Sequence, residues 1–338
     1  MVRSSHCIFK QFIEAMQVVA GKIVVLGTGG TIAGTAASAE DNIGYTAAQV
    51  GVGQLLAAVP GLERAAQGAV FEAEQVAQID SKDMDDAVWG ALALRCAERL
   101  ADPQVRGLVV THGTDTLEET AWFLHRVLAG AAHKPVVLVS AMRPATAQAP
   151  DGPQNLLDAM AVITTPGARG VVTVAAGEVH GARLVQKVHP YRLHAFASAD
   201  AGPLGWVEQG AVRLASNWPD AAVESAKIAI ENVAKAKDWP RVEIVLSHAG
   251  ATGRAVDLLV ADGVHGLVVA ATGNGTLHHR LQAALERAQA AGVAVRVATR
   301  CPLGQVLPRP GDTLPDSQGM SAVKARVDLL LELLSTGA

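Results

Sequence analysis

The chain has 338 residues, of which 50% are hydrophobic and 18% charged, so it is long enough for two domains and can bury a core of ordinary size. Its formal net charge of -4 and its aromatic content of 4% disfavour a nucleic-acid partner, which calls for a basic surface and stacking side chains, and also disfavour an anionic membrane surface. No apolar run approaches the roughly 20 residues that a membrane-spanning helix needs.

The cysteines and the N-terminal residues indicate the compartment. The chain has three cysteines, Cys7, Cys96 and Cys301. An odd number without a C-x-x-C pair argues against a disulfide framework and a structural zinc site, and it favours a reducing compartment. Lys10 and Glu14 interrupt the apolar stretch that a signal peptide would require, so we expect a cytoplasmic protein. Residues 1–21 are interpreted as a loose tail, and Met16 could serve as an alternative start.

Short apolar runs and amphipathic segments alternate through the first two-thirds of the chain. Four runs are almost wholly apolar, as expected of central strands covered on both faces: Lys22–Gly27, Val105–Thr111, Pro135–Ala141 and Gly170–Ala175. Three segments have the pattern of helices: Asp83–Leu100, Thr116–Leu128 and Asp151–Thr164. The alternation predicts an α/β fold whose larger N-terminal domain, residues 1–212, has a mainly parallel sheet with helices on both faces.

The alternation pauses at residues 213–240, which contain Asn217, Pro219, Pro240 and several charges, and which we interpret as a linker. It then resumes with three predicted strands, Val242–Ser247, Gly266–Thr272 and Val293–Ala298, and three predicted helices near 253–261, 277–290 and 320–335. Residues 241–338 are therefore predicted to form a smaller C-terminal α/β domain.

The first predicted strand runs directly into a glycine-rich segment, GTGGTIAG. Glycines at the carboxyl end of a strand let the backbone approach a ligand closely, and open α/β sheets bind ligands at that edge. Ile32 stands where a dinucleotide fingerprint needs its third glycine, and the Gly-Lys-Ser/Thr of a Walker loop is absent. The segment presents the hydroxyl of Thr31 instead. The residues alone leave Thr31 as either a functional hydroxyl or an ordinary turn residue.

A second polar cluster, THGTDTLEET, follows another predicted strand. The helix that begins here offers free N–H groups and a partial positive charge, which suit a substrate carboxylate or an oxyanion. Thr116 and Glu119 have the spacing of a capping box, in which each side chain bonds the other's backbone. His112 is interpreted as a packed interior histidine. Thr114 and Asp115 have no capping role and are the functional candidates.

A third candidate is the pair Asp80-Ser81, within the segment Gln78–Met84, which has the pattern of another strand-to-helix corner. Serine commonly caps a helix, so the residues alone leave Ser81 as either a cap or a group that contacts substrate.

Taken together, these segments resemble a known family. TGGTIAG (28–34) and HGTDT (112–116) are similar to the two signature segments of bacterial-type L-asparaginases. Further similar segments are Asp80-Ser81, AMRP (141–144) followed by DGP (151–153), and GNG (273–275). The resemblance runs in the same order from about residue 22 to the C-terminal helix.

The resemblance implies a two-domain amidohydrolase that releases ammonia from L-asparagine without a cofactor or metal. Thr31 matches the family's nucleophile, and Tyr45, after the loop 34–44, matches the tyrosine that hydrogen-bonds it. Thr114 matches a second essential threonine, and Lys187 matches the lysine that polarises it. Together with Asp115 these groups would supply the catalysis. The residues do not decide whether Thr31 or Thr114 attacks first.

The resemblance also implies how substrate is held. Asp115 matches the carboxylate that binds the α-amino group, and Ser81 matches a group that binds the α-carboxylate. Further substrate-binding positions are Asp80, Thr114 and Asn274. One methylene separates asparagine from glutamine, which is worth only about 1–3 kcal/mol in a pocket, so we expect some glutaminase side activity.

The chain departs from the family pattern at two places, and the resemblance also implies an oligomeric state. Thr276 stands where the family often has a second asparagine. The family commonly supplies an acidic residue to the site of a neighbouring subunit, and only Asp312 is a candidate for it here. The family forms homotetramers built as dimers of dimers, which the resemblance implies for this chain.

Three alternatives stay open at this stage. A binding protein for asparagine or aspartate would need the glycine-rich loop, Ser81 and Asp115, but neither threonine hydroxyl. Another amidohydrolase, such as a subunit of a tRNA-linked amidotransferase, would usually need further domains. A nucleotide-binding protein is disfavoured because the phosphate-binding fingerprints are missing.

Overall fold

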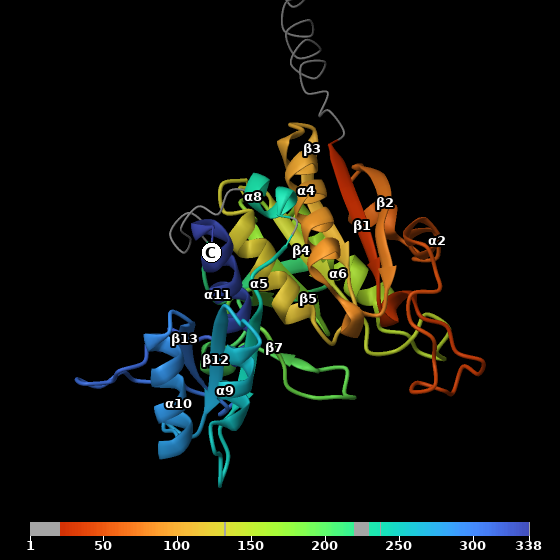
Figure 1. The fold of residues 1–338 in the computed structure, drawn as a ribbon. Coiled ribbons are helices and arrows are strands. Elements are labelled where there is room, and N and C mark those ends of the chain that lie inside the picture. The colour runs from red at the N-terminus through yellow and green to blue at the C-terminus, as the bar shows by residue number, and fades with distance from the viewer. Residues whose placement is uncertain (1–20, 132, 220–229, 237, 338) are drawn as a thin grey trace, which may run out of the picture.

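The computed structural model describes residues 21–131, 133–219, 230–236 and 238–337 (Figure 1). The suggested alternative start at Met16, and all of the suggested tail except its last residue, lie outside the described residues. In the described part of the chain, no helix is long and apolar enough to cross a membrane.

The N-terminal part is built on an eight-stranded sheet with the order β10-β9-β6-β5-β4-β3-β1-β2. Five strands run parallel: β1 (Lys22–Gly29), β2 (Val70–Ile79), β3 (Val105–Thr111), β4 (Pro135–Val139) and β5 (Gly170–Ala175). Three more extend it in antiparallel fashion: β6 (Glu178–Gly181), β9 (Gly205–Glu208) and β10 (Ala211–Leu214). The predicted mainly parallel sheet is confirmed. For β2 the sequence indicated only the end of the strand, at the corner Gln78–Met84, because the strand lies at the sheet edge, is only partly buried and lacks a continuous apolar run.

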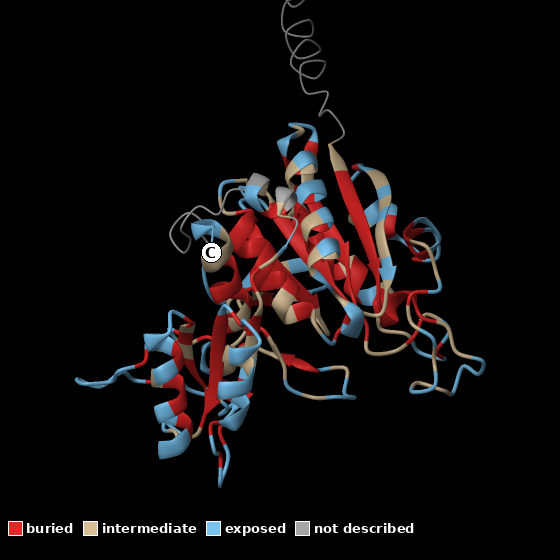
Figure 2. Cartoon of the chain, viewed as in Figure 1, coloured by how far each residue is buried: buried red, intermediate tan, exposed pale blue. Residues whose placement is uncertain are grey.

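Helices cover both faces of this sheet, as predicted. They are α4 (Asp86–Ala101) and α5 (Leu117–Val127) on one face, and α2 (Val52–Ala57), α3 (Leu62–Ala65) and α6 (Gly152–Thr164) on the other. Successive side chains of a strand point to opposite faces. Accordingly Val24 and Leu26 of β1 join the core beneath α4 and α5, whereas Ile23 and Val25 join the core beneath α2, α3 and α6. Figure 2 shows β1 as an almost continuous buried strand.

The order of the strands places the two motif loops side by side. β2 lies on one side of β1 and β3 lies on the other, so the direction in which strands are added reverses at β1. Open α/β sheets bind ligands at the carboxyl ends of the strands that flank such a reversal. The TGGTIAG segment begins within the end of β1, and the HGTDT segment directly follows β3.

The C-terminal part has a smaller parallel sheet, in the order β11-β12-β13. Its strands are β11 (Val242–Leu246), β12 (Gly266–Ala271) and β13 (Ala294–Thr299), and its helices are α9 (Arg254–Ala261), α10 (His279–Ala290) and α11 (Ala322–Thr336). α9 and α10 pack on one face of the sheet. α11 packs on the other face and also against α5, so the last helix of the chain joins both sheets through one core (Figure 1).

The segment 213–240 is not wholly irregular in its described part. It contains the end of β10 and the short helix α8 (Ile230–Lys235), whose Val233 is buried with α4. The division into residues 1–212, a linker at 213–240 and residues 241–338 stays a prediction.

Candidate active site

Three loops that follow β1, β2 and β3 touch one another through glycine backbone. A Cβ atom on Gly30 would lie 2.3 Å from the N and Cα atoms of Gly113, and a Cβ atom on Gly113 would lie 2.4 Å from the Oγ atom of Ser81. Gly30 also has a φ of +81°, which L side chains rarely adopt. Only glycine lets these loops approach so closely, and the contact brings Thr31, Ser81 and Thr114 to one edge of the sheet.

Thr31 begins the short 3-10 helix η1 (Thr31–Ala33) and is 6% exposed. Its Oγ1 atom lies 2.6 Å from the Oη atom of Tyr45, and either hydroxyl can be the donor. Tyr45 returns along a surface loop that closes with an antiparallel bridge between Thr35 and Thr46. The loop also bonds the backbone of the segment after β4, where the N–H of Gln148 donates to the carbonyl of Ala39 at 2.9 Å.

Thr114 has a cationic partner. The Nζ atom of Lys187 donates to Thr114 Oγ1 at 2.8 Å and to Asp115 Oδ1 at 2.6 Å. Lys187 lies on β7 (Gln186–Lys187), a two-residue strand paired with β8 (Phe196–Ala197). A cation that donates to a hydroxyl stabilises negative charge on its oxygen, and such bonds are roughly twice as strong as neutral ones. The arrangement therefore makes it easier for Thr114 to give up its proton.

Ser81 connects the loop after β2 to the Thr114 loop. Its Oγ atom accepts from the backbone N–H of Asp115 at 3.2 Å, and its carbonyl accepts from Thr116 Oγ1 at 2.7 Å. The cap of the 3-10 helix that Ser81 begins is Asp80, whose side chain accepts from Lys82 N and also pairs with the Lys82 ammonium at 2.8 Å. Asp80 thus flanks the cluster and is engaged with its own neighbour.

The predicted capping box at the start of α5 is wrong. Thr116 does occupy the cap position, but its side chain makes no capping bond and donates to Ser81 instead. Glu119 does not reach back to the cap. It is largely buried, which raises its pKa to about 7, with the positive charge of Arg326 opposing that shift. Contact between two loops has replaced the local motif.

His112 stiffens the Thr114 loop. It is fully buried, its Nδ1 atom lies 2.7 Å from the carbonyl of Gly113, and its Nε2 atom lies 2.9 Å from Thr120 Oγ1. Trp89 Nε1, which can only donate, bonds the same hydroxyl at 2.9 Å, so Thr120 donates its proton to Nε2 and Nδ1 carries the ring proton. Burial lowers the pKa of His112 to about 4, so the ring is neutral. The interpretation of a packed interior histidine is confirmed.

The AMRP and DGP segments support the loops of the site. Asp151 accepts from the backbone N–H groups of Met142 at 2.9 Å and Arg143 at 3.0 Å, which fixes the loop after β4. A Cβ atom on Gly152 would lie 2.8 Å from the side chain of Ile32, so α6 begins directly against the 3-10 helix of Thr31. The matched residues in these segments support the loops. They do not join the hydroxyl groups of Thr31, Tyr45, Ser81 and Thr114, which together form the hydroxyl cluster.

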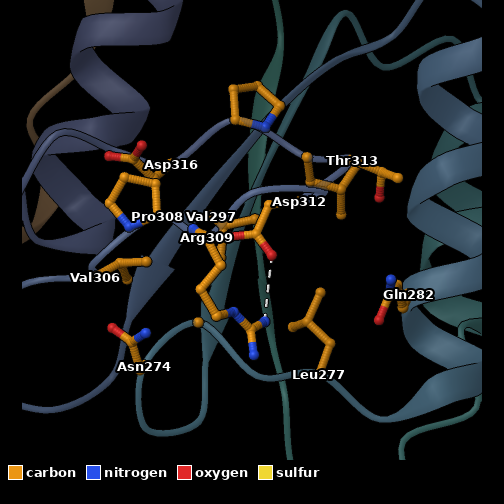
Figure 3. Close-up of a pocket in the computed structure, with 13 residues that line it drawn as sticks. Asn274, Leu277, Gln282, Val297, Val306, Pro308, Arg309, Asp312, Thr313 and Asp316 are labelled. Carbon is orange, nitrogen blue, oxygen red and sulfur yellow. Dashed lines mark hydrogen bonds and ion pairs between the residues drawn. The ribbon is translucent and has the colours of Figure 1, made fainter.

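Asn274 and Asp312 lie in the C-terminal part. Asn274 accepts from the N–H of Leu307 at 2.6 Å and donates to its carbonyl at 3.0 Å. Asp312 is paired with Arg309 at 3.2 Å, and both line the same pocket as Asn274 (Figure 3). Within the described residues of this one chain, neither side chain contacts Thr31 or Thr114.

Sequence reasoning missed Glu118, which lies in the first turn of α5. Its Oε1 atom accepts from the backbone N–H of Lys187 at 3.5 Å, and its other carboxylate oxygen is buried. A glutamate in the first turn of a helix normally needs no explanation beyond the helix dipole. Its link to Lys187 spans 69 residues of sequence and could be seen only in the fold.

Comparison with known proteins agrees with this geometry. Residues 22–220 match the family model "Asparaginase, N-terminal", and residues 241–337 match "Glutaminase/Asparaginase C-terminal domain". The chain is 38% identical over 284 residues to L-asparaginase 2 of Escherichia coli strain K12, which covers 83% of this chain and 78% of that protein. It is 35% identical over 323 residues to a glutaminase-asparaginase of Pseudomonas fluorescens biotype A, covering 93% and 86%.

Solved structures and compartment names add to this. The crystal structure of a probable cytoplasmic L-asparaginase from Campylobacter jejuni superposes with a TM-score of 0.84 at 36% identity, covering 93% of this chain and 95% of that one. A relative from Haemophilus influenzae, 36% identical over 322 residues and covering 93% of this chain and 89% of that protein, is named a probable periplasmic L-asparaginase. With both family models matched in order along nearly the whole described chain, the protein belongs to the asparaginase family.

Proposed function

We propose that the protein is an L-asparaginase that hydrolyses the side-chain amide of L-asparagine to L-aspartate and ammonia, with some activity on L-glutamine. The observation that carries this proposal is the pair of hydroxyls on adjacent loops, each with its own activating partner: Thr31 beside Tyr45, and Thr114 beside Lys187. A binding protein for asparagine has no need of such partners. An amide is a poor electrophile and threonine a poor nucleophile, so both must be activated at once.

In the first step, Thr31 Oγ1 forms a bond to the amide carbon while its proton passes, by way of the Tyr45 hydroxyl, toward the amide nitrogen. The C–N bond then breaks, the nitrogen leaves as ammonia with the proton returned to it, and an ester of Thr31 remains. N–H groups of the motif loops are suited to meet the oxyanion, and each such donor typically contributes roughly 10²–10³-fold.

In the second step, water attacks the ester and Thr31 leaves with its proton. Thr114, held by Lys187, is placed to take a proton from that water, and general base help of this kind typically contributes about 10²–10⁴-fold. The same contacts would also let Thr114 begin the reaction. A burst of ammonia equal to the enzyme concentration, with ester trapped on Thr31 by acid quench, would assign the first attack to Thr31.

Substrate would be held by both α-groups. Asp115 is the carboxylate for the α-amino group, and its side chain is 54% exposed, so it is open to a ligand while it pairs with Lys187. Ser81 and the N-terminus of α5 are suited to the α-carboxylate. Asp80 is proposed to support this contact. Asn274 is proposed to contact substrate in the site of a neighbouring subunit.

The protein is further proposed to act as a homotetramer, a dimer of dimers, in the cytoplasm. Its relatives carry both cytoplasmic and periplasmic names. Asp312 is the candidate for the acidic residue that would cross to a neighbouring site. Light scattering of the active enzyme tests the assembly, and an active monomer would contradict it.

The test of function is ammonia release from L-asparagine and L-glutamine by wild type, Thr31→Ala and Thr114→Ala. We expect both variants to lose about 10³-fold or more of kcat, because each removes a hydroxyl that takes part in bond making or proton transfer. Thr46→Ala is the matched control, since its exposed side chain lies on the Tyr45 loop outside the hydroxyl cluster. A folded wild type that binds asparagine but releases no ammonia would point to a binding protein.

A further inference from the structure

A buried lysine outside the hydroxyl cluster holds the backbone that leads to Lys187. Lys324 lies in the first turn of α11 and is 0% exposed. Its Nζ atom donates to the carbonyl oxygens of Ala182 at 2.8 Å, Arg183 at 2.9 Å and Val185. All three donor sites of the ammonium are thereby used on one turn, which is 139 to 142 residues away in sequence.

This turn leads directly to Lys187. It runs into β7, where Lys187 is only two residues beyond Val185, and among the described residues β7 pairs with one equally short strand, β8. A hairpin of this length is marginally stable by itself. The direction of Lys187 toward Thr114 and Asp115 must therefore be set by what holds the turn before it.

Glu118 holds the same strand from the other side, through the N–H of Lys187. It also interacts with Lys324 through opposite charge. Burial raises the pKa of Glu118 and the positive charge of Lys324 opposes this, while burial lowers the pKa of Lys324 to about 7 and the negative charge of Glu118 opposes that. Arg183 and His180 also face Lys324. The charge of Arg183 lowers the pKa of Lys324 further, and the pKa of His180 is lowered to about 4 by burial and, to a smaller extent, by the charge of Lys324.

We infer that Lys324 is a positioning residue that, together with Glu118, fixes the ammonium of Lys187 against Thr114 and Asp115 and so couples the C-terminal helix to the active site of the same chain. The inference rests on the proposed function for its kinetic readout. An apolar side chain could fill the space of Lys324, but it would leave the carbonyls of Ala182, Arg183 and Val185 without this donor, and the turn would be free to shift. Displacements of about 1 Å at a reacting group can cost 10²-fold in rate.

The decisive variant is Lys324→Met, which keeps the length and removes the ammonium. We expect kcat for L-asparagine to fall about 10–100-fold while KM changes less than about threefold, because Ser81 and its bonds to Asp115 and Thr116 are untouched. Arg326→Met is the matched control. Arg326 lies on the same helix and donates to a carbonyl at 3.0 Å, but that carbonyl belongs to Val242, away from the site. It should keep kcat within about twofold.

A purely structural role is separated by two further measurements. If Lys324 acts through Lys187, then adding Lys324→Met to Lys187→Met should cost nothing more, which can be followed with the activated substrate L-aspartate β-hydroxamate. Lys324→Gln, which keeps an N–H donor, should recover part of the lost kcat. An additional loss in the Lys187→Met background equal to that in wild type, or equal losses from the lysine and arginine variants, would overturn the inference.

Hydrogen exchange gives a readout that does not depend on activity. The peptide that covers residues 182–188 should exchange faster in Lys324→Met and be unchanged in Arg326→Met. Should Lys324→Met fail to fold, Glu118→Ala makes the same predictions for the peptide and for the Lys187→Met background. A wild type that releases no ammonia would defeat the proposed function alone, whereas an active wild type matched by Lys324→Met in both rate and exchange would defeat the inference alone.

Discussion

The two hydroxyls of the site are held in different ways. Thr114 lies in a loop braced by the buried chain of bonds from Trp89 through Thr120 to His112, and its partner Lys187 follows the turn whose carbonyls Lys324 binds. Thr31 relies on Tyr45, which comes from a surface loop that is exposed at residues 37–40 and tied mainly by backbone bonds.

The difference suggests a division of work. Binding loops that must open are drawn from the less stable parts of a fold, whereas groups that stabilise charge need fixed geometry. The Tyr45 loop is suited to admit substrate and then complete the Thr31 side, while the Thr114 side is ready beforehand. The following predictions test this division.

The largest effect on kcat is expected on the Thr114 side of the site, which is the fixed side. Lys187→Met removes the cation on Thr114 without removing packing volume, and we expect kcat to fall about 10³-fold, as for the loss of other preorganised donors. Steady-state ammonia release measures it. Retention of more than a tenth of wild-type kcat would show that the fixed side is dispensable.

The brace at His112 should make stability depend on pH. Its pKa is about 4 in the folded protein and 6.5 ordinarily, so below pH 6.5 the unfolded chain binds a proton that the folded protein refuses. Neutral His112 therefore contributes fully to the free energy of unfolding above pH 6.5. As the pH falls toward 4, about 2–3 kcal/mol of that free energy is lost.

Urea unfolding between pH 7 and pH 4 measures this slope. The slope reports the number of protons that the chain takes up when it unfolds. His112→Gln should lower that number by up to about one, whatever its effect on stability at pH 7. His133→Gln, at an exposed histidine, is the control and should leave it unchanged. If the stability of wild type and of His112→Gln changed with pH in parallel, the pKa of His112 would not be lowered in the folded protein.

The smallest effect is expected from a change in the Tyr45 loop, on the Thr31 side of the site. The carboxylate of Asp41 accepts from the N–H groups of Ile43 at 2.9 Å and Gly44 at 2.7 Å, just before Tyr45, and these bonds lower its pKa. Asp41→Ala should loosen the loop tip, raising KM for asparagine about two- to fivefold while kcat stays within about twofold. A kcat loss as large as that of Lys187→Met would contradict the division between the two sides.

Much of this protein could be predicted from its sequence. Apolar runs mark central strands because parallel strands are buried on both faces, so the α/β class followed directly. Thr31, Ser81 and Thr114 were singled out because each follows a strand, and the resemblance added Tyr45 and Lys187. The capping box failed because Thr116 bonds a loop 35 residues away instead of its own helix.

Only the tertiary structure decided which distant groups meet. Local pattern reports the period of a strand or helix, but it carries no information about contacts across a hundred residues. Strand order put the loops of Thr31 and Thr114 together at the reversal beside β1. Packing of α11 between two sheets buried Lys324 against the turn that precedes Lys187, although a lysine in the sequence would otherwise be expected at the surface.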